Sequence, residues 1–273
     1  MSGNTIPKET EQTIEQLANN VNYAFFVAYV KSLPNWQNLK VLDYGCGRGV
    51  IVHRLRQEGV ECYGAEAFYE GSQLQEVREG TLFREGIIRE IPPSGELPFP
   101  DHFFDVIISN QVFEHVEDLE SVLAHLSRVL KPDGVMRHHF PSREVIYEGH
   151  IGIPFAHWLP KGRLRFLYTA ALRGVGFGYF KLDKPITRWT YDELNWLDNF
   201  CYYRPYKSLS RMLSRDYEVS HCEIDYCRFR ARNRPVLRFL LSIEPLRGVY
   251  ERIFRLLAFM AIELRKRVDC QRR

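Results

Sequence analysis

The chain has 273 residues, of which 45% are hydrophobic and 26% are charged. This length fits one large domain or two small ones, and the composition excludes disordered, collagen-like and coiled-coil proteins. The net charge of +3 conceals a division: residues 1–160 hold 13 Lys and Arg against 22 Asp and Glu, whereas residues 161–273 hold 24 against 12. The acidic front half and the basic back half need separate explanations.

The cysteines and the N-terminus indicate the cellular compartment. Six cysteines are scattered along the chain without a CxxC pair, which is typical of a reduced, intracellular protein. The first residues, MSGNTIPKETEQ, are polar and unlike a signal peptide. The apolar run at 256–262 is too short to span a bilayer. We therefore expect a cytoplasmic protein, either soluble or peripheral to a membrane.

Hydrophobic spacing predicts alternating helices and strands in the first half of the chain. The expected order is helix 9–30, strand 40–44, helix 50–57, strand 62–65, a weak helix at 71–79, a short strand at 81–83, strand 104–109, helix 117–130 and strand 135–140. Strands that alternate with helices indicate an α/β fold with a doubly wound, mostly parallel sheet.

The second half of the chain departs from this alternation. We expect helices at 162–173, 191–199 and 206–213, a strand at 217–226, a helical stretch at 235–255 and a strand at 258–266. The alternative for the tail is a basic amphipathic helix lying on a membrane. If the run RFRARNR lay on a strand, Arg228, Arg230, Arg232 and Arg234 would share one face. Such a row either binds phosphates or is a solvated strand end.

A glycine-rich turn carries the clearest chemical signal. In VLDYGCGRGV, a buried strand brings Asp43 to its carboxyl end, and Gly45, Gly47 and Gly49 follow. Without Cβ atoms, this turn lets a ligand approach the backbone closely, next to the N-terminus of a helix. The acid before the glycines suits a cationic or hydroxyl-bearing ligand and disfavours a pyrophosphate.

Glu66 ends the second predicted strand, 17 residues after Gly49. In doubly wound folds, an acid at about this spacing binds the hydroxyls of a ribose. The alternative is an ordinary surface glutamate, and the preceding glycine turn favours ribose binding.

These motifs resemble the class I S-adenosylmethionine-dependent methyltransferases, most closely the UbiE-like group of small-molecule enzymes. The resemblance runs from VLDYGCGRG through Glu66 to ELPFPDHFFDVIISNQVFEHVEDLESVLAHLSRVLKPDGVM. It implies a seven-stranded, Rossmann-like sheet with S-adenosylmethionine as cofactor. The cofactor-binding residues that it implies are Asp43, Gly45, Cys46, Gly47, Gly49, Glu66 and Asn110. Where the family often has an acid for adenine, this chain has Ile87 and Ile88.

Methyl transfer to a hydroxyl can require a general base, and histidine suits that role at neutral pH. The candidates are His115, His138, His139, His150 and His157. We expect His150, His115 and His157 to be catalytic, and we prefer His150 because Glu148 is near enough in sequence to orient it. A metal site is the competing interpretation, since Glu114 and His115 partly match the ExxEH motif of metal-dependent RNA 2′-O-methyltransferases. Gln111 stands where that motif has its first glutamate, so we expect no metal.

Together these observations predict one methyltransferase domain over residues 1–273. We expect a helical cover (1–37), a cofactor-binding core (38–140), a substrate-side insertion (141–216) and closing strands (217–273) that contain the helical insertion 235–255. The expected reaction is methyl transfer to an oxygen or nitrogen of a small, anionic, lipid- or sugar-linked acceptor. The alternatives are an RNA methyltransferase, a non-catalytic S-adenosylmethionine-binding protein, and an oxidoreductase, which the glycine spacing disfavours.

Overall fold

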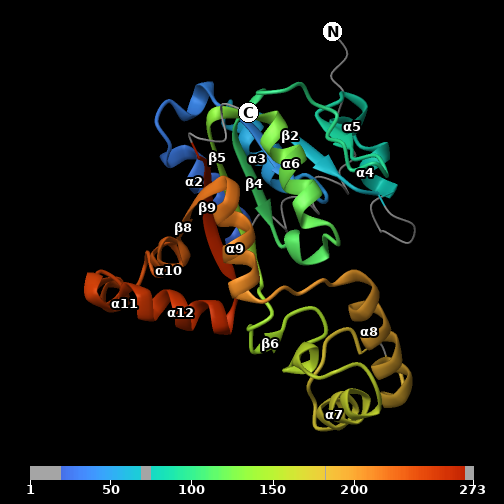
Figure 1. Ribbon diagram of the computed structural model, residues 1–273. Helices are drawn as coiled ribbons and strands as arrows, with labels where there is room; N and C mark the ends of the chain where they lie inside the picture. The colour runs from blue at the N-terminus through green and yellow to red at the C-terminus, as the bar shows by residue number, and fades with distance from the viewer. Residues whose placement is uncertain (1–19, 69–74, 182, 268–273) are drawn as a thin grey trace.

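The computed structural model describes residues 20–68, 75–181 and 183–267. Its centre is a seven-stranded sheet with the strand order β3-β2-β1-β4-β5-β9-β8 (Figure 1). The strands are β1 (Lys40–Tyr44), β2 (Glu61–Glu66), β3 (Ile88–Glu90), β4 (Phe104–Asn110), β5 (Leu130–Phe140), β8 (Tyr217–His221) and β9 (Met260–Lys266). Strands β1 to β5 are parallel, and β9 is antiparallel to both β5 and β8. The doubly wound sheet and its closing strand near 258–266 are thus confirmed.

Two buried clusters cover the two faces of the sheet. Successive residues of a strand point to opposite faces, so Val41 joins one cluster and Leu42 the other. The first face is covered by α2 (Val21–Ser32) and α3 (Val50–Gln57), and the second by α6 (Leu119–Val129) and α9 (Tyr206–Asp216). Because both faces are covered, the central strands are continuous apolar runs rather than alternating ones.

The segment between β2 and β4 corrects one prediction. Residues 81–83, expected as a strand, belong to helix α5 (Thr81–Arg84), which follows α4 (Gln75–Glu79). The third strand is β3, where Ile88 packs beside Gly64 of β2. β-Branched Ile87 and Ile88 suit a buried strand better than residues 81–83 do. The predicted helix 9–30 is present as α2 from Val21, and residues 1–19 and 69–74 lie outside the described part.

A lobe extends from the carboxyl end of β5, below the sheet in Figure 1. It contains β6 (Tyr147–Glu148), β7 (Ile153–Pro154), α7 (Arg163–Gly174) and α8 (Ile186–Phe200). It has its own small core around Trp189. The chain enters and leaves the lobe side by side, where the backbone N–H of Arg143 donates to the carbonyl of Arg204 (2.9 Å). The helices expected in this region are therefore present.

The chain after β8 corrects a second prediction. The strand expected at 217–226 ends at His221, and α10 (Glu223–Arg230) follows. A helix points residues two apart to nearly opposite sides, so Ile224 and Tyr226 are buried in different clusters. Its acidic first turn and basic last turn also match the helix dipole. The four arginines therefore do not share a strand face.

The expected helical stretch at 235–255 is present but broken. It consists of α11 (Pro235–Leu240), a short 3-10 turn (Glu244–Leu246) and α12 (Arg247–Leu257). Among the residues that the structure describes, no helix has the length and hydrophobicity needed to cross a membrane.

Candidate active site

The glycine turn lies at the carboxyl end of β1, where the strand order reverses between β1 and β4. Ligands of open α/β sheets bind at such a point. Gly45 has a φ of +69°, and a Cβ there would lie 2.4 Å from a methyl group of Val112. Gly47 has a φ of +54°, and a Cβ there would have no atom within 4 Å. Val112 therefore fills the space beside Gly45, whereas the space beside Gly47 is free for a ligand.

Two carboxylates flank this opening. Asp43 is only 2% exposed, and burial raises its pKa well above the ordinary value, with a further contribution from the Glu66 charge. Glu66 accepts hydrogen bonds from the backbone N–H groups of Gly47 (2.7 Å) and Ala67 (3.0 Å). Burial raises the pKa of Glu66, although these two donors oppose the shift. A ligand with a positive charge and hydroxyl groups would match both acids.

Asn110 and Cys46 complete this part of the site. Asn110 ends β4, and its buried Oδ1 has no hydrogen-bond partner among the described residues. Cys46 is buried beneath the turn, where a Cβ on Gly64 would lie 2.6 Å from its sulfur. Burial also raises the pKa of the Cys46 thiol. The unpartnered amide, the open backbone at Gly47 and the two acids fit S-adenosylmethionine, which carries a sulfonium, an ammonium and ribose hydroxyls.

Comparison with known proteins agrees with this geometry. The model of a family described as "Methyltransferase domain" matches residues 10–217. The chain belongs to this family, the class I S-adenosylmethionine-dependent methyltransferases. The expected family, fold and cofactor are thereby confirmed. A crystal structure of an S-adenosylmethionine-dependent methyltransferase from Mesorhizobium loti has the same fold, with 17% identity and a TM-score of 0.52 over 92% of this chain and all of that one.

Two curated methyltransferases illustrate the range of similar proteins. A ubiquinone biosynthesis O-methyltransferase of Mesorhizobium japonicum is 28% identical over 139 residues, which cover 48% of this chain and 53% of that protein. A norajmaline N-methyltransferase of Rauvolfia serpentina is 27% identical over 117 residues, which cover 42% and 40%. The chain thus spans about half the length of the curated relatives it matches.

Two of the three histidines expected to be catalytic meet beside the carboxyl edge of this methyltransferase sheet. His115 follows β4, whereas His150 comes from the turn between β6 and β7 of the lobe. Their Nε2 atoms lie 3.2 Å apart. The side chain of His150 is 22% exposed, so the pair is accessible to solvent.

Hydrogen bonds on the far side of each ring determine what these Nε2 atoms can do. The Nδ1 of His115 lies 2.6 Å from the carbonyl oxygen of Phe200, and the Nδ1 of His150 lies 2.8 Å from Glu148 Oε1. Both partners accept hydrogen bonds, so each Nδ1 carries a proton, and in neutral rings the two Nε2 lone pairs face each other. The pair is therefore arranged to take up one shared proton.

The surroundings favour placing that proton on His150. Burial alone would lower the pKa of His150, but the Glu148 carboxylate holds it above its ordinary value. Burial lowers the pKa of His115. Glu148 itself is buried and accepts hydrogen bonds from the Tyr203 hydroxyl (2.6 Å) and the backbone N–H of Ile151 (2.7 Å). A fixed carboxylate of this kind both orients His150 and stabilises its charged form.

Sequence reasoning missed Tyr203 and Cys201 beside the pair, and it considered Glu114 only as a metal ligand. Cys201 lies 3.8 Å from His115 Nδ1, and burial raises the pKa of its thiol. Glu114 is 1% exposed, neither carboxylate oxygen has a partner on another described residue, and burial raises its pKa to about 8. Of these three residues, only Glu114 could be placed near the pair from the sequence, because it directly precedes His115.

The remaining histidines occupy different positions. The Nε2 of His157 lies 3.1 Å from the carbonyl oxygen of Arg143, and its ring packs at a tilt against that of Tyr203. His157 therefore adjoins the pair without joining it. His138 and His139 are fully buried on β5. His138 bonds to Ser109, and burial lowers its pKa to about 3, while His139 packs against Phe26 on the other face. Neither ring reaches the pair.

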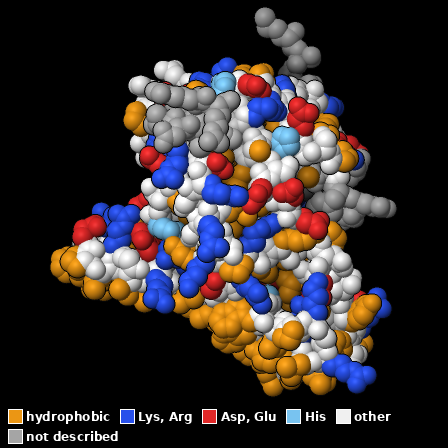
Figure 2. Space-filling model, in the orientation of Figure 1, with side chains coloured by type: hydrophobic (Ala, Val, Ile, Leu, Met, Phe, Trp, Pro, Cys, Tyr) orange, Lys and Arg blue, Asp and Glu red, His pale blue; other side chains and the backbone are white. Residues whose placement is uncertain are grey.

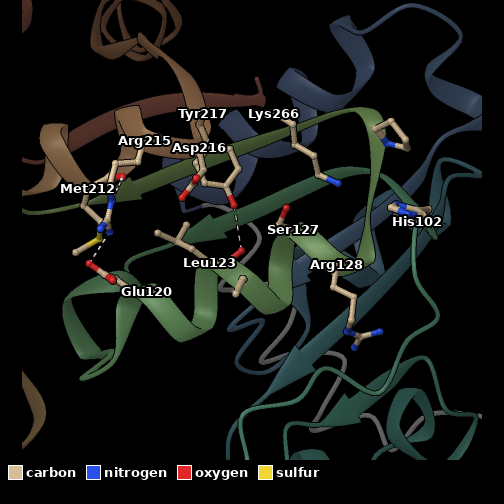
Figure 3. Close-up of a pocket in the computed structure, with 12 residues that line it drawn as sticks. His102, Glu120, Leu123, Ser127, Arg128, Met212, Arg215, Asp216, Tyr217 and Lys266 are labelled. Atoms are coloured by element: carbon tan, nitrogen blue, oxygen red, sulfur yellow. Dashed lines mark hydrogen bonds and ion pairs between the residues drawn. The ribbon is translucent and has the colours of Figure 1, made fainter. Parts of the chain in front are cut away.

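A cavity of about 750 Å³ lies at the opposite edge of the sheet (Figure 3). It is bordered by α6, α9 and the ends of β8 and β9. Its cationic groups already have partners: Arg215 pairs with Glu120, and Lys266 donates to the carbonyl of Leu130. The cavity is remote from the glycine turn, and we assign it no part in methyl transfer.

Proposed function

We propose that the protein transfers a methyl group from S-adenosylmethionine to an oxygen or nitrogen of a small, anionic acceptor that is linked to a lipid or a sugar. The observation that carries the acceptor chemistry is the pair of facing Nε2 atoms of His115 and His150. A nucleophile that loses a proton on methylation needs a group to receive it. The O- and N-methyltransferases among the similar proteins act on such nucleophiles.

In this proposal the cofactor is held by residues at the carboxyl ends of β1, β2 and β4. Asp43 and the backbone of Gly45, Cys46, Gly47 and Gly49 bind the methionine part, Glu66 accepts from the ribose hydroxyls, and Asn110 lies near the sulfonium. When bound, S-adenosylmethionine supplies an electrophilic methyl group. The apolar positions Ile87 and Ile88, which are buried at the sheet edge, suit contact with the adenine.

The residues of the lobe then receive the acceptor and its proton. As the acceptor oxygen or nitrogen forms its bond to the methyl carbon, its proton passes to the gap between His150 and His115. Glu148 stabilises the resulting positive charge on His150, and Tyr203 holds the carboxylate in place. We assign His157 to the wall of the acceptor site, beside Tyr203. No metal ion is needed in this scheme, because the two facing Nε2 lone pairs accept the proton that the acceptor loses.

The proposal also assigns functions to the parts of the chain. Residues 38–140 bind the cofactor, the insertion at 141–216 selects the acceptor, and residues 217–273 close the sheet. The insertion and the closing part hold the basic excess of the sequence. We therefore expect the acceptor to be negatively charged.

Two measurements test the proposal. Titration calorimetry should detect S-adenosylmethionine binding by the wild-type protein and much weaker binding by Asp43→Ala. A screen of polar lipids, glycans and phenols, followed as S-adenosylhomocysteine release, should identify an acceptor. With that acceptor, His150→Gln should lower kcat by about 10²–10⁴-fold, the usual contribution of a general base. Unchanged binding in Asp43→Ala, or an unchanged kcat in His150→Gln, would contradict the assignments.

A further inference from the structure

Strongly exposed large hydrophobic side chains are confined to one part of the molecule. Among the described residues, all of them lie between Phe155 and Leu257, and residues 20–154 have none. They belong to the lobe, to the helices α11 and α12 and to the 3-10 turn between these two helices. Scattered exposed hydrophobic residues are normal, but a concentration of this kind marks a binding surface.

The helices α7 and α12 each expose an ordered apolar face. On α7, Leu164 and Leu167 are each 65% exposed, while Arg165 and Thr169 are buried on the other side. On α12, Val249, Ile253 and Leu257 follow at steps of four residues and are 53%, 49% and 61% exposed. Residues three or four apart share one side of a helix. The side chains therefore form continuous apolar faces, not isolated contacts.

These faces lie on the same side of the molecule. Figure 2 shows hydrophobic side chains along its lower edge, from α11 and α12 on the left to the lobe at the bottom, with Lys and Arg side chains above them. On α11, Val236 and Phe239 are 74% and 70% exposed. We call this surface the apolar edge. It is formed by the exposed side chains of α7, α11 and α12 and of the loops beside α7, and it includes Leu164, Leu167, Val236, Phe239, Val249, Ile253 and Leu257.

The charge beside the apolar edge indicates what covers it. Residues 230–257 contain seven arginines and two glutamates. Arg232, Arg234, Arg238 and Arg252 are exposed and form no ion pair with a carboxylate of the described residues. An apolar helix face with basic residues beside it is typical of proteins that lie on anionic membranes. A second copy of this chain would instead bring two basic surfaces together, which is unfavourable.

We propose that the apolar edge docks on an anionic lipid bilayer. In the docked state, the apolar side chains enter the boundary between headgroups and acyl chains, while the arginines contact lipid phosphates. Arg232 and Arg234, the two arginines of RFRARNR in that exposed and unpaired set, thus acquire a role that does not depend on a strand.

The docked orientation would bring the proposed acceptor site toward the membrane. Phe155 and Trp158, which are 37% and 42% exposed, flank His157 in the sequence, and their ring centroids lie 4.9 Å apart. The ring of His157 lies 4.6 Å from that of Tyr203, which bonds to Glu148. A lipid-linked acceptor could therefore reach the histidine pair from the bilayer. This last step rests on the proposed function, whereas docking itself does not.

Vesicle sedimentation with the 273-residue chain tests docking without any methyl transfer. We expect binding to phosphatidylcholine vesicles that contain phosphatidylglycerol, weaker binding at high salt, and little binding to phosphatidylcholine alone. Leu164→Glu/Leu167→Glu and Val236→Glu/Phe239→Glu should each weaken binding at least about tenfold, since each removes two apolar contacts and adds two negative charges.

The control variant Gln37→Glu/Gln57→Glu adds the same two negative charges at exposed positions near the central sheet, away from the apolar edge. Its vesicle binding should fall less than that of either apolar variant. Absence of wild-type binding to anionic vesicles, or equal losses in all three variants, would overturn the proposal. So would a wild-type dimer in light scattering that Leu164→Glu/Leu167→Glu dissociates, because a second copy would then be the occupant. Vesicle binding by a protein that transfers no methyl group would support docking and contradict only the proposed function.

Discussion

The Nε2 atoms of His115 and His150 face each other across 3.2 Å, although the residues are 35 positions apart in the chain. A carbonyl and a carboxylate fix the proton on Nδ1 of each ring. This leaves the two lone pairs directed at a single proton position.

The proton affinity of the pair should depend on Glu148. This carboxylate holds the pKa of His150 above its ordinary value, so Glu148→Gln should lower that pKa. Because a base must be unprotonated to act, the acid limb of the kcat profile should move to lower pH, and the plateau should fall as the base weakens. Glu144→Gln is the control, since Glu144 accepts from the backbone of Tyr206 in the same region. An acid limb that stays in place in Glu148→Gln would argue against His150 as the base.

Zinc should bind the two histidines of the pair and thereby stop them from accepting a proton. His115, His150 and Cys201 each offer a ligand atom within 4.8 Å of the others, and zinc prefers such nitrogen and sulfur ligands. We expect added Zn²⁺ to inhibit methyl transfer, Cys201→Ser to reduce this sensitivity and His157→Gln to retain it. Treatment with a chelator should leave the rate unchanged. Loss of activity on chelation, with recovery on adding a metal, would show that the gap holds a cation during catalysis.

The open backbone at Gly47 should matter for cofactor affinity more than for folding. A Cβ at Gly47 would meet no atom within 4 Å, and the same holds at Gly59, which also has a positive φ. Alanine at either position should lower the free energy of unfolding by about 1–2 kcal/mol, because the backbone there is left-handed. Only Gly47→Ala should also weaken S-adenosylmethionine binding, by at least about tenfold, because its methyl group occupies the ligand's approach. Calorimetry and urea unfolding of both variants separate the two effects, and equal affinities would refute this placement of the cofactor.

A buried ion pair should make the closing part of the sheet sensitive to acid. Glu223 is fully buried and pairs with Arg255 at 2.9 Å. Burial alone would raise its pKa, but His221 and Arg255 hold it below the ordinary value. A lowered pKa in the folded state adds stability above the unfolded pKa of about 4.5, and this is lost as the pH falls through the folded value.

Glu223→Gln should therefore cost about 3 kcal/mol at pH 7 and flatten the decline of stability between neutral and acid pH. Urea unfolding at several pH values measures both effects. The exposed Glu218→Gln on the neighbouring strand is the matched control and should change little. A variant as stable as the wild type at pH 7 would show that the pair contributes nothing.

Local sequence patterns predicted the parts of the fold that depend on residues close together in the chain. The turn after Tyr44, the acid at Glu66 and the closing strand were all predictable from residues within one element or one turn. The strand expected at 217–226 failed because Ile224 and Tyr226 alternate as on a strand, yet they pack into separate clusters from one helix. Two-residue alternation cannot reveal that the buried groups have different partners.

The surroundings of the histidine pair were less predictable, because they depend on contacts between distant segments. Glu148 precedes His150 by two residues and was recognised as its partner. Tyr203 bonds to the same carboxylate from 55 positions away, and the carbonyl of Phe200 reaches His115 from 85 positions away. Only the folding of α8 against the loop after β4 brings these groups together.

The chain enters the lobe near Arg143 and leaves it near Arg204, so the histidine pair is divided between two parts of the molecule. His115 stays with the sheet, whereas His150, Glu148 and Tyr203 all belong to the lobe. Exchange of the lobe for that of a relative would thus leave the cofactor edge intact while replacing one partner of the pair together with the acceptor site. The lobe would thus carry both the acceptor site and one of the two rings that accept the proton. Only a lobe that places a ring equivalent to that of His150 beside His115 would yield an active chimera.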